Sequence, residues 1–224
     1  MRTAWAVLRK DLRQELRSAD TLPAMVLFAV VTIVIFHFAL DRDTLSGQEA
    51  AGVFVIALLF AAMLGINRLF VAEREQGGFD GFLLAPVDRS AMLLAKAGAL
   101  YLFLVVLEVI AVPAFKLLLL EPGLGRVLPG LVAVLALTNL ALAVIGTLVS
   151  AVAVHTRARD LIGPMIGLPL LVPALIAAAR AAGPILRSAH APTAPPVRWM
   201  GTLGLYDLVF ALLAYAVFDF LLEE

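Results

Sequence analysis

The chain has 224 residues, of which 62% are hydrophobic and 15% charged, with a mean hydropathy of +1.01 and a formal net charge of zero. Globular proteins average about 45–50% apolar residues, so this composition excludes an ordinary water-soluble domain and predicts an integral membrane protein. The absence of cysteine excludes disulfides, thiolate metal sites and cysteine nucleophiles.

An amphipathic helix is predicted first, over residues 1–19. At 100° per residue, Trp5, Leu8, Leu12 and Leu16 form an apolar stripe, and basic side chains cluster to one side of it. This pattern is typical of a helix that lies in the membrane interface. Its role is either simple anchoring, docking of a cytoplasmic partner, or both.

Six apolar runs follow, and each approaches the roughly 20 residues that a helix needs to cross a bilayer core about 30 Å thick. They cover residues 22–40, 50–66, 91–115, 127–154, 161–182 and 201–222. Alternating ten-residue strands are absent, so helices rather than a barrel must carry these spans. The sequence therefore predicts one all-α membrane domain over residues 1–224.

The fifth run is rich in glycine and proline within eleven residues: Gly163, Pro164, Gly167, Pro169 and Pro173. Proline removes a helix hydrogen bond and clashes with the preceding turn, so we expect this span to be kinked or broken. Such a break is either purely structural or serves as a moving gate or a recess for a ligand. An external loop is predicted after it, over residues 183–200.

The distribution of basic residues predicts the orientation. With a cytoplasmic N-terminus, eleven lysines and arginines fall on the inner side and six on the outer side. The positive-inside rule favours this arrangement, with both termini in the cytoplasm. The inner set is Arg2, Arg9, Lys10, Arg13, Arg17, Arg68, Arg74, Arg89, Lys96, Arg157 and Arg159, and the outer set is Arg42, Lys116, Arg126, Arg180, Arg187 and Arg198.

Residues 73–89, between the second and third spans, form the most unusual segment. Phe79, Phe82 and Leu83 have the i, i+3, i+4 spacing of a short helix, which Pro86 would end. Charges of both signs surround this ridge, and they are Glu73, Arg74, Glu75, Asp80, Asp88 and Arg89. We interpret the segment as a short transverse coupling helix that a cytoplasmic partner moves; the alternative is a solvated loop whose charges only set topology.

Motifs for catalysis are missing. No glycine-rich loop is followed by Gly-Lys-Ser/Thr, so nucleotide chemistry must come from another subunit. G-x-S-x-G and H-E-x-x-H are also absent. We therefore expect no catalytic residue, no metal site and no enzyme activity in this chain.

Charged residues inside the spans are expensive and normally face protein or water. Glu108 and Asp207 are the two candidates, both toward the outer side. They are expected to line one external cavity, to pair through hydrogen bonds, or to pack structurally between helices. Lys96 and Asp219 lie near the inner interface, where snorkelling of the side chain explains both.

Three histidines are the remaining candidate ligands, because imidazole can bind haem iron. His37 and His190 lie on the outer side and His155 at the inner interface. No spacing supports a shared site, so each is expected to be a polar interface residue, with haem contact at His37 or His190 as the weaker alternative.

The whole chain resembles the CcmB family, the haem-exporter permeases of the bacterial cytochrome c maturation system, within the ABC-2 type permeases. The resemblance rests on Lys10-Asp11-Leu12-Arg13-Gln14-Glu15-Leu16-Arg17, on Asn67-Arg68 and Glu73-Arg74-Glu75-Gln76-Gly77, on Leu83-Leu84-Ala85-Pro86-Val87-Asp88-Arg89 followed by Lys96, and on Thr156-Arg157-Ala158-Arg159-Asp160 with the prolines of the fifth span.

The resemblance implies a six-span permease in the bacterial inner membrane, present in two copies. Its implied partners are a cassette ATPase (CcmA), a haem-handling membrane protein (CcmC), a small membrane protein (CcmD) and a haem chaperone (CcmE). ATP would act only through the ATPase, with residues 73–89 against its surface, and haem would be a handled ligand rather than a firmly bound cofactor. Other interpretations are a general ABC-2 exporter permease for another substrate, a proton-coupled carrier that uses Glu108 and Asp207, and an assembly scaffold.

Overall fold

The structure, a computed structural model, describes residues 2–40, 44–45, 47–71, 89–120, 124–154, 159–187 and 196–221. These residues form seven helices and no sheet, with one isolated bridge between Leu45 and Leu120. The helices are α1 (Arg2–Ser18), α2 (Thr21–Ala39), α3 (Gly47–Arg68), α6 (Arg89–Leu119), α7 (Leu124–Val154), α8 (Arg159–Arg187) and α9 (Val197–Leu221). All except α1 are long and apolar enough to cross a membrane. The prediction of an all-helical protein with six spans is confirmed.

The helices extend beyond several of the predicted runs. α3 starts three residues before residue 50, and α6 continues to Leu119 instead of ending at residue 115. α8 also continues through Pro184 to Arg187, and α9 starts at Val197, so both ends of the predicted loop over 183–200 are helical. Apolar runs end at charged or turn-forming residues, whereas helices continue until their backbone hydrogen bonding stops.

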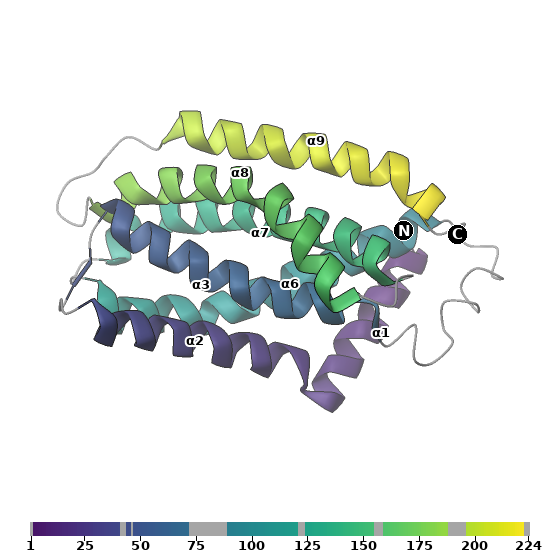
Figure 1. Cartoon of the computed structure of the whole chain (residues 1–224), viewed down its shortest axis with the longest axis horizontal. Helices are drawn as coiled ribbons and strands as arrows, with labels where there is room; N and C mark the ends of the chain where they lie inside the picture. The colour runs from purple at the N-terminus through teal and green to yellow at the C-terminus, as the bar shows by residue number, and fades with distance from the viewer. Residues whose placement is uncertain are drawn as a thin grey trace.

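Six helices lie side by side along the long axis, and α1 runs across one end of this bundle (Figure 1). Both chain termini lie at that end, which we call the α1 end. Helices α3 and α7 are central, because 61% and 72% of their apolar windows are buried, against 17% for α2 and α9. The outer helices therefore present most of their apolar side chains to the surroundings, as lipid-facing helices do.

Close approach of the central helices depends on small residues. A Cβ atom on Gly146 of α7 would lie only 2.6 Å from Ile66 Cγ1 of α3. A Cβ atom on Gly65 of α3 would lie 2.9 Å from Met25 Sδ of α2. Without a hydrophobic force between helices in lipid, small residues at such crossings are what allow tight van der Waals packing.

Helix α8 contains Pro164, Pro169, Pro173 and Pro184 and is nevertheless one helix from Arg159 to Arg187. Figure 1 shows that its course turns near the middle. The predicted fifth span is therefore kinked rather than broken. Next to Pro169, the Tyr206 hydroxyl of α9 donates a hydrogen bond to Leu170 O at 2.6 Å, which ties α8 to α9.

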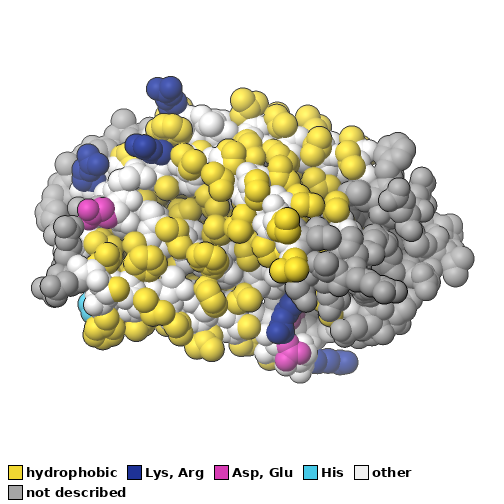
Figure 2. Space-filling view, viewed as in Figure 1, with side chains coloured by type: hydrophobic (Ala, Val, Ile, Leu, Met, Phe, Trp, Pro, Cys, Tyr) yellow, Lys and Arg dark blue, Asp and Glu magenta, His cyan; other side chains and the backbone are white. Residues whose placement is uncertain are grey.

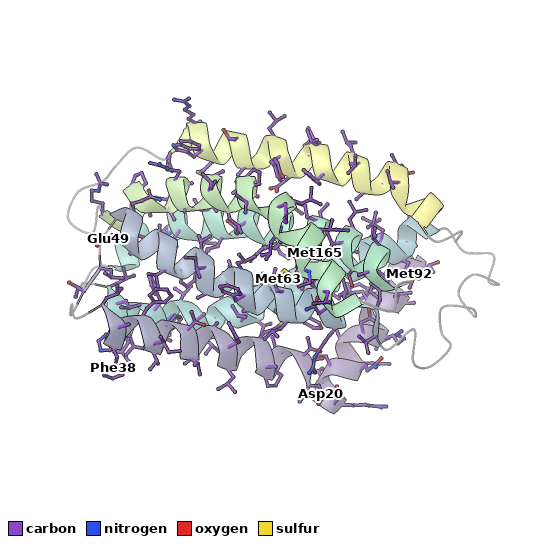
Figure 3. All side chains as sticks on the ribbon, viewed as in Figure 1. Asp20, Phe38, Glu49, Met63, Met92 and Met165 are labelled. Carbon is purple, nitrogen blue, oxygen red and sulfur yellow. The ribbon has the colours of Figure 1, made fainter. Side chains whose placement is uncertain are left out.

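The surface has the layering of a membrane protein. Figure 2 shows hydrophobic side chains over the middle of the visible face and charged side chains toward its two ends. Figure 3 places Asp20 at the joint between α1 and α2, and Phe38 at the opposite end of α2. The apolar zone thus covers the length of the spans, and α1 lies at one of its borders.

Candidate functional site

The candidate site is at the α1 end, where the chain leaves and re-enters the bundle on either side of residues 72–88. Helix α3 ends at Arg68 and the described chain continues to Val71, and α6 begins at Arg89. The predicted coupling residues Glu73, Arg74, Glu75, Phe79, Asp80, Phe82 and Asp88 lie outside the described residues, as does the predicted transverse helix. Arg89 is the first residue of α6.

A buried lysine joins three elements there. Lys96 of α6 is only 2% exposed. Its Nζ lies 2.9 Å from Asp11 Oδ2 of α1 and donates a hydrogen bond to Leu69 O, just after α3, at 3.0 Å. The same Nζ lies 5.3 Å from the centroid of the Phe70 ring. We call Asp11, Leu69, Phe70 and Lys96 the Lys96 cluster.

This arrangement corrects the expectation that Lys96 snorkels. A snorkelling side chain extends its charged end into water, whereas the Lys96 ammonium points into protein. Burial of a charge is expensive unless it is paired and hydrogen-bonded. Asp11 supplies the countercharge, Leu69 O accepts a hydrogen bond, and the Phe70 ring supplies a cation–π contact. The side chain of Asp219, the other predicted snorkelling residue, lies outside the described side chains.

The end of α3 receives two side-chain donors from neighbouring helices. The last carbonyl groups of a helix have no partner within it. The Ser150 hydroxyl of α7 donates to Ile66 O at 2.8 Å, and Lys96 donates to Leu69 O. The point where the chain departs toward residue 72 is therefore fixed by side chains from α6 and α7.

Helix α1 is joined to α2 by a tight, hydrogen-bonded turn. Ala19 has φ +50°, and its N–H donates to Glu15 O at 2.7 Å, which ends α1. Glu15 Oε1 then accepts from Thr21 N at 2.8 Å and from Leu22 N at 2.6 Å. The carboxylate thus caps the start of α2, where it also meets the positive end of the helix dipole.

A small cavity lies beside this site. It has about 10 Å³ of space for water, close to the minimum for one molecule. Its lining comes from α3 and the residues after it, from α7 and from α8, and consists of Ile66, Asn67, Phe70, Val71, Ser150, Ala153 and Gly163. A cavity of this size is far too small for haem.

The intramembrane polar candidates are separate from this cluster. Glu108 of α6 faces the Asn139 amide of α7. The contact lacks good hydrogen-bond geometry, since Glu108 Oε1 and both amide atoms of Asn139 have no partner within the described part of the chain. Asp207 of α9 is 2% exposed, and its two oxygens likewise have no hydrogen-bond partner among the described residues. Of the three alternatives for Glu108 and Asp207, a hydrogen bond between them is not present in the described structure.

Of the three candidate histidines, the structure describes His37. His37 lies in the last turn of α2, and its ring packs against Phe38 with centroids 5.0 Å apart. His155 and His190 lie outside the described residues. Within the described ranges, no group of three or more His, Cys, Asp or Glu side chains is placed to hold a metal ion.

Sequence reasoning missed the roles of Asp11, Glu15 and Ser150. A signal was available for the first two, because they are four residues apart and lie on the side of α1 away from most of its basic side chains. Their partners are distant in sequence or are backbone atoms, so the sequence pattern alone could not predict these contacts.

Comparison with known proteins gives a consistent result. Residues 2–218 match the family model described as "CcmB protein". The chain is 34% identical over 178 residues to "Heme exporter protein B" of Paracoccus denitrificans, covering 79% of this chain and 80% of that protein. It is 29% identical over 172 residues to the protein of the same name from Rhodobacter capsulatus, covering 76% and 78%. The protein of that name from Pseudomonas aeruginosa is 28% identical over 201 residues, covering 89% and 88%.

Proposed function

This chain belongs to the CcmB family, and we propose that it is the non-catalytic permease subunit of an ABC transporter that acts in cytochrome c maturation. Its matched relatives are named heme exporter protein B, which supports haem as the transported or handled ligand. In this proposal a separate cassette ATPase hydrolyses ATP. The permease converts that energy into haem export, or into release of a haem-loaded chaperone on the periplasmic side.

The observation that carries the mechanism is the double engagement of Lys96. Lys96 lies near the start of α6, after residues 72–88, and its side chain binds Leu69 O, before them. It therefore links the two stretches of chain that flank residues 72–88. A segment that is pressed by a partner needs fixed ends, or the local backbone absorbs the displacement. The Lys96 cluster supports residues 73–89 as the surface that the ATPase engages.

The proposed orientation places the α1 end in the cytoplasm of a bacterium, with the chain in the inner membrane. The excess of eleven basic residues over six on that side supports it. Helix α1 then lies in the cytoplasmic interface, and the α8–α9 connection faces the periplasm. Haem would meet this chain only as cargo, with His37 and His190 as the weaker contact candidates.

Membership of the family supports a set of partners. We propose a cassette ATPase (CcmA), the membrane proteins CcmC and CcmD, the haem chaperone CcmE and a second copy of this permease. Affinity purification of the tagged chain in mild detergent tests this set. Recovery of an ATPase together with haem-handling proteins is expected; recovery of the chain alone, or with glycosyltransferases, would favour a permease for another substrate.

Charge reversal at Glu73 and Glu75 tests the coupling surface. The double Lys variant should insert normally but lose ATPase association and cytochrome c yield. Glu49→Lys is the matched control, since Glu49 is an exposed acid at the opposite end of the bundle (Figure 3). Normal ATPase association and normal cytochrome c yield in the double variant would refute the coupling role.

A second candidate function is a proton-coupled carrier. Two observations favour it: the buried oxygens of Asp207 have no hydrogen-bond partner among the described residues, and Glu108 lies on α6, a helix that contacts α9. This function predicts transport into vesicles that is driven by a pH gradient without nucleotide and is lost in Asp207→Asn. The ABC proposal predicts transport that requires the ATPase and ATP.

A further inference from the structure

Helix α1 carries two acidic residues among its basic ones, and the structure turns both acids inward. Asp11 pairs with the buried Lys96, and Glu15 accepts two backbone hydrogen bonds at the start of α2. Lys10 also approaches Asp11, at 3.3 Å, but its own side chain remains 53% exposed. The charge left on the outward face of α1 is therefore almost entirely positive.

The outward face has two parts. Trp5 and Leu16 are 64% and 83% exposed, and at 100° per residue they lie about 20° apart, along one edge of the face. Arg9, Lys10, Arg13 and Arg17 are exposed and fill the sector from about 40° to about 140° from Trp5. Leu8 and Leu12, which share the predicted stripe with Trp5 and Leu16, are instead partly buried. Packing against the bundle thus splits the stripe and leaves an apolar edge beside a basic sector.

The joint to α2 fixes the level of this face. α2 is a candidate membrane span from its first residue, Thr21, and α1 ends at Ser18. The three residues from Ser18 to Thr21 can span no more than about 11 Å. The Glu15 cap and the Lys96 pair hold α1 across the end of the bundle (Figure 1). The basic sector must therefore lie at the depth of the lipid headgroups.

We infer that the outward face of α1 is a binding surface for anionic phospholipids, with Trp5 and Leu16 among the acyl chains and Arg9, Lys10, Arg13 and Arg17 on the phosphate groups. Tryptophan and arginine in this arrangement are typical of helices that bind anionic interfaces. An acidic soluble protein would complement the charge but would leave the adjacent apolar edge without a partner. This inference rests on the interfacial position proposed for α1 and not on the identity of the transported ligand.

The chain offers a direct probe, because Trp5 and Trp199 are its two tryptophans. In the full-length Trp199→Phe variant, reconstituted in phosphatidylcholine bilayers with about one-third phosphatidylglycerol, Trp5 is the sole tryptophan. Its fluorescence is quenched in parallel samples by brominated phosphatidylglycerol or by brominated phosphatidylcholine at equal mole fraction. One basic residue near an anionic surface contributes about 1 kcal/mol, so we expect a preference for phosphatidylglycerol of about fivefold or more. High salt should reduce it.

Substitution of the basic residues gives the matched comparison. Arg9→Gln, Lys10→Gln, Arg13→Gln and Arg17→Gln together should bring the preference close to one without removing quenching. Arg180→Gln, Arg187→Gln and Arg198→Gln, at the opposite end of the bundle, should leave it unchanged. If the α1 variant is poorly produced, the salt titration of the Trp199→Phe protein alone still decides.

Each other result overturns the inference. Equal quenching by the two lipids at low salt would mean an interfacial helix without selectivity for anionic lipid. Absence of quenching by both would also refute the interfacial position of α1, while leaving the ATPase coupling proposal to its own test. Cross-linking of the basic sector to an acidic protein, with no lipid preference, would replace lipid by that partner.

Discussion

Removal of one member of the buried ion pair should destabilise the protein more than removal of both. In Asp11→Asn the Lys96 ammonium stays buried, at 3% side-chain exposure, and loses the Asp11 carboxylate at 2.9 Å. Breaking a buried pair in this way costs about 3–5 kcal/mol. Since 1 kcal/mol shifts the midpoint of a protein of this size by about 2–4 °C, the apparent Tm should fall by about 6–20 °C.

The double variant Asp11→Asn/Lys96→Met should recover part of this loss, because two uncharged side chains of similar volume replace the pair. The remaining deficit is about 1–3 kcal/mol for Leu69 O, which loses its side-chain donor. Lys10→Met is the control. Lys10 also lies near Asp11, but its exposed side chain should contribute no more than about 1 kcal/mol.

Thermal stability in detergent, followed by size-exclusion chromatography after heating, provides the measurement. The expected order of apparent Tm is native and Lys10→Met highest, the double variant next, and Asp11→Asn lowest. If the losses of Asp11→Asn and Lys96→Met simply add in the double variant, the two residues do not interact. If Asp11→Asn resembles Lys10→Met, the pair is exposed to solvent and the reasoning from burial is wrong.

Three further predictions use matched substitutions. Glu15→Ala should lower stability by about 0.5–2 kcal/mol through loss of a helix cap, whereas Asp20→Ala should have little effect, since Asp20 makes no side-chain cap hydrogen bond; equal effects in thermal melts would contradict the Glu15 cap. Gly146→Ala should cost about 1–3 kcal/mol by overpacking against α3, and Gly201→Ala, with nothing within 4 Å of its Cβ position, should be neutral in the same melts. Asn139→Leu should be neutral or stabilising, because the amide has no partner among the described residues to lose; a large loss of stability would show that the amide is hydrogen-bonded.

The sequence predicted the spans well because hydrocarbon imposes a length and a composition on every crossing helix. It predicted the kink of α8 for an equally local reason, the prolines at 164, 169 and 173. The end of α8 was placed too early because Gly183 and Pro184 are usual loop residues, yet both are helical here. Helix α3 comes close to α8 at Gly183. A Cβ atom there would lie 2.5 Å from Gln48 Oε1 and 3.4 Å from Gln48 Cα, so the glycine suits this contact.

The candidate site was predicted only in part. The position of residues 72–88 between two spans follows from hydropathy, but the support for it does not. Lys96 is paired with a residue 85 positions earlier and bonded to a carbonyl 27 positions earlier, and neither partner leaves a periodic signal. For a lysine this close to the start of a span, the sequence favours snorkelling, because it leaves the charge in water. Only the fold of α1 back onto α6 makes burial the better alternative.

The Lys96 cluster also restricts how a permease of this kind can move. A displacement applied between Val71 and Arg89 reaches α6 directly and reaches the end of α3 through Leu69 O. It reaches α1 through Asp11 and α2 through the Glu15 cap. Movement of α1 or α6 alone would unpair the buried charges of Asp11 and Lys96, at a cost comparable to the 3–5 kcal/mol expected for Asp11→Asn. The less costly response is for the bundle to move as one body against its neighbours in the membrane, which is the usual form of switching at subunit interfaces.

The tightly packed crossing of α3 and α7 at Gly146 favours the same response, since a packed interface resists continuous deformation. Movement of the bundle as one body, rather than the opening of a hinge inside it, is therefore the response that this arrangement of charges and helices favours.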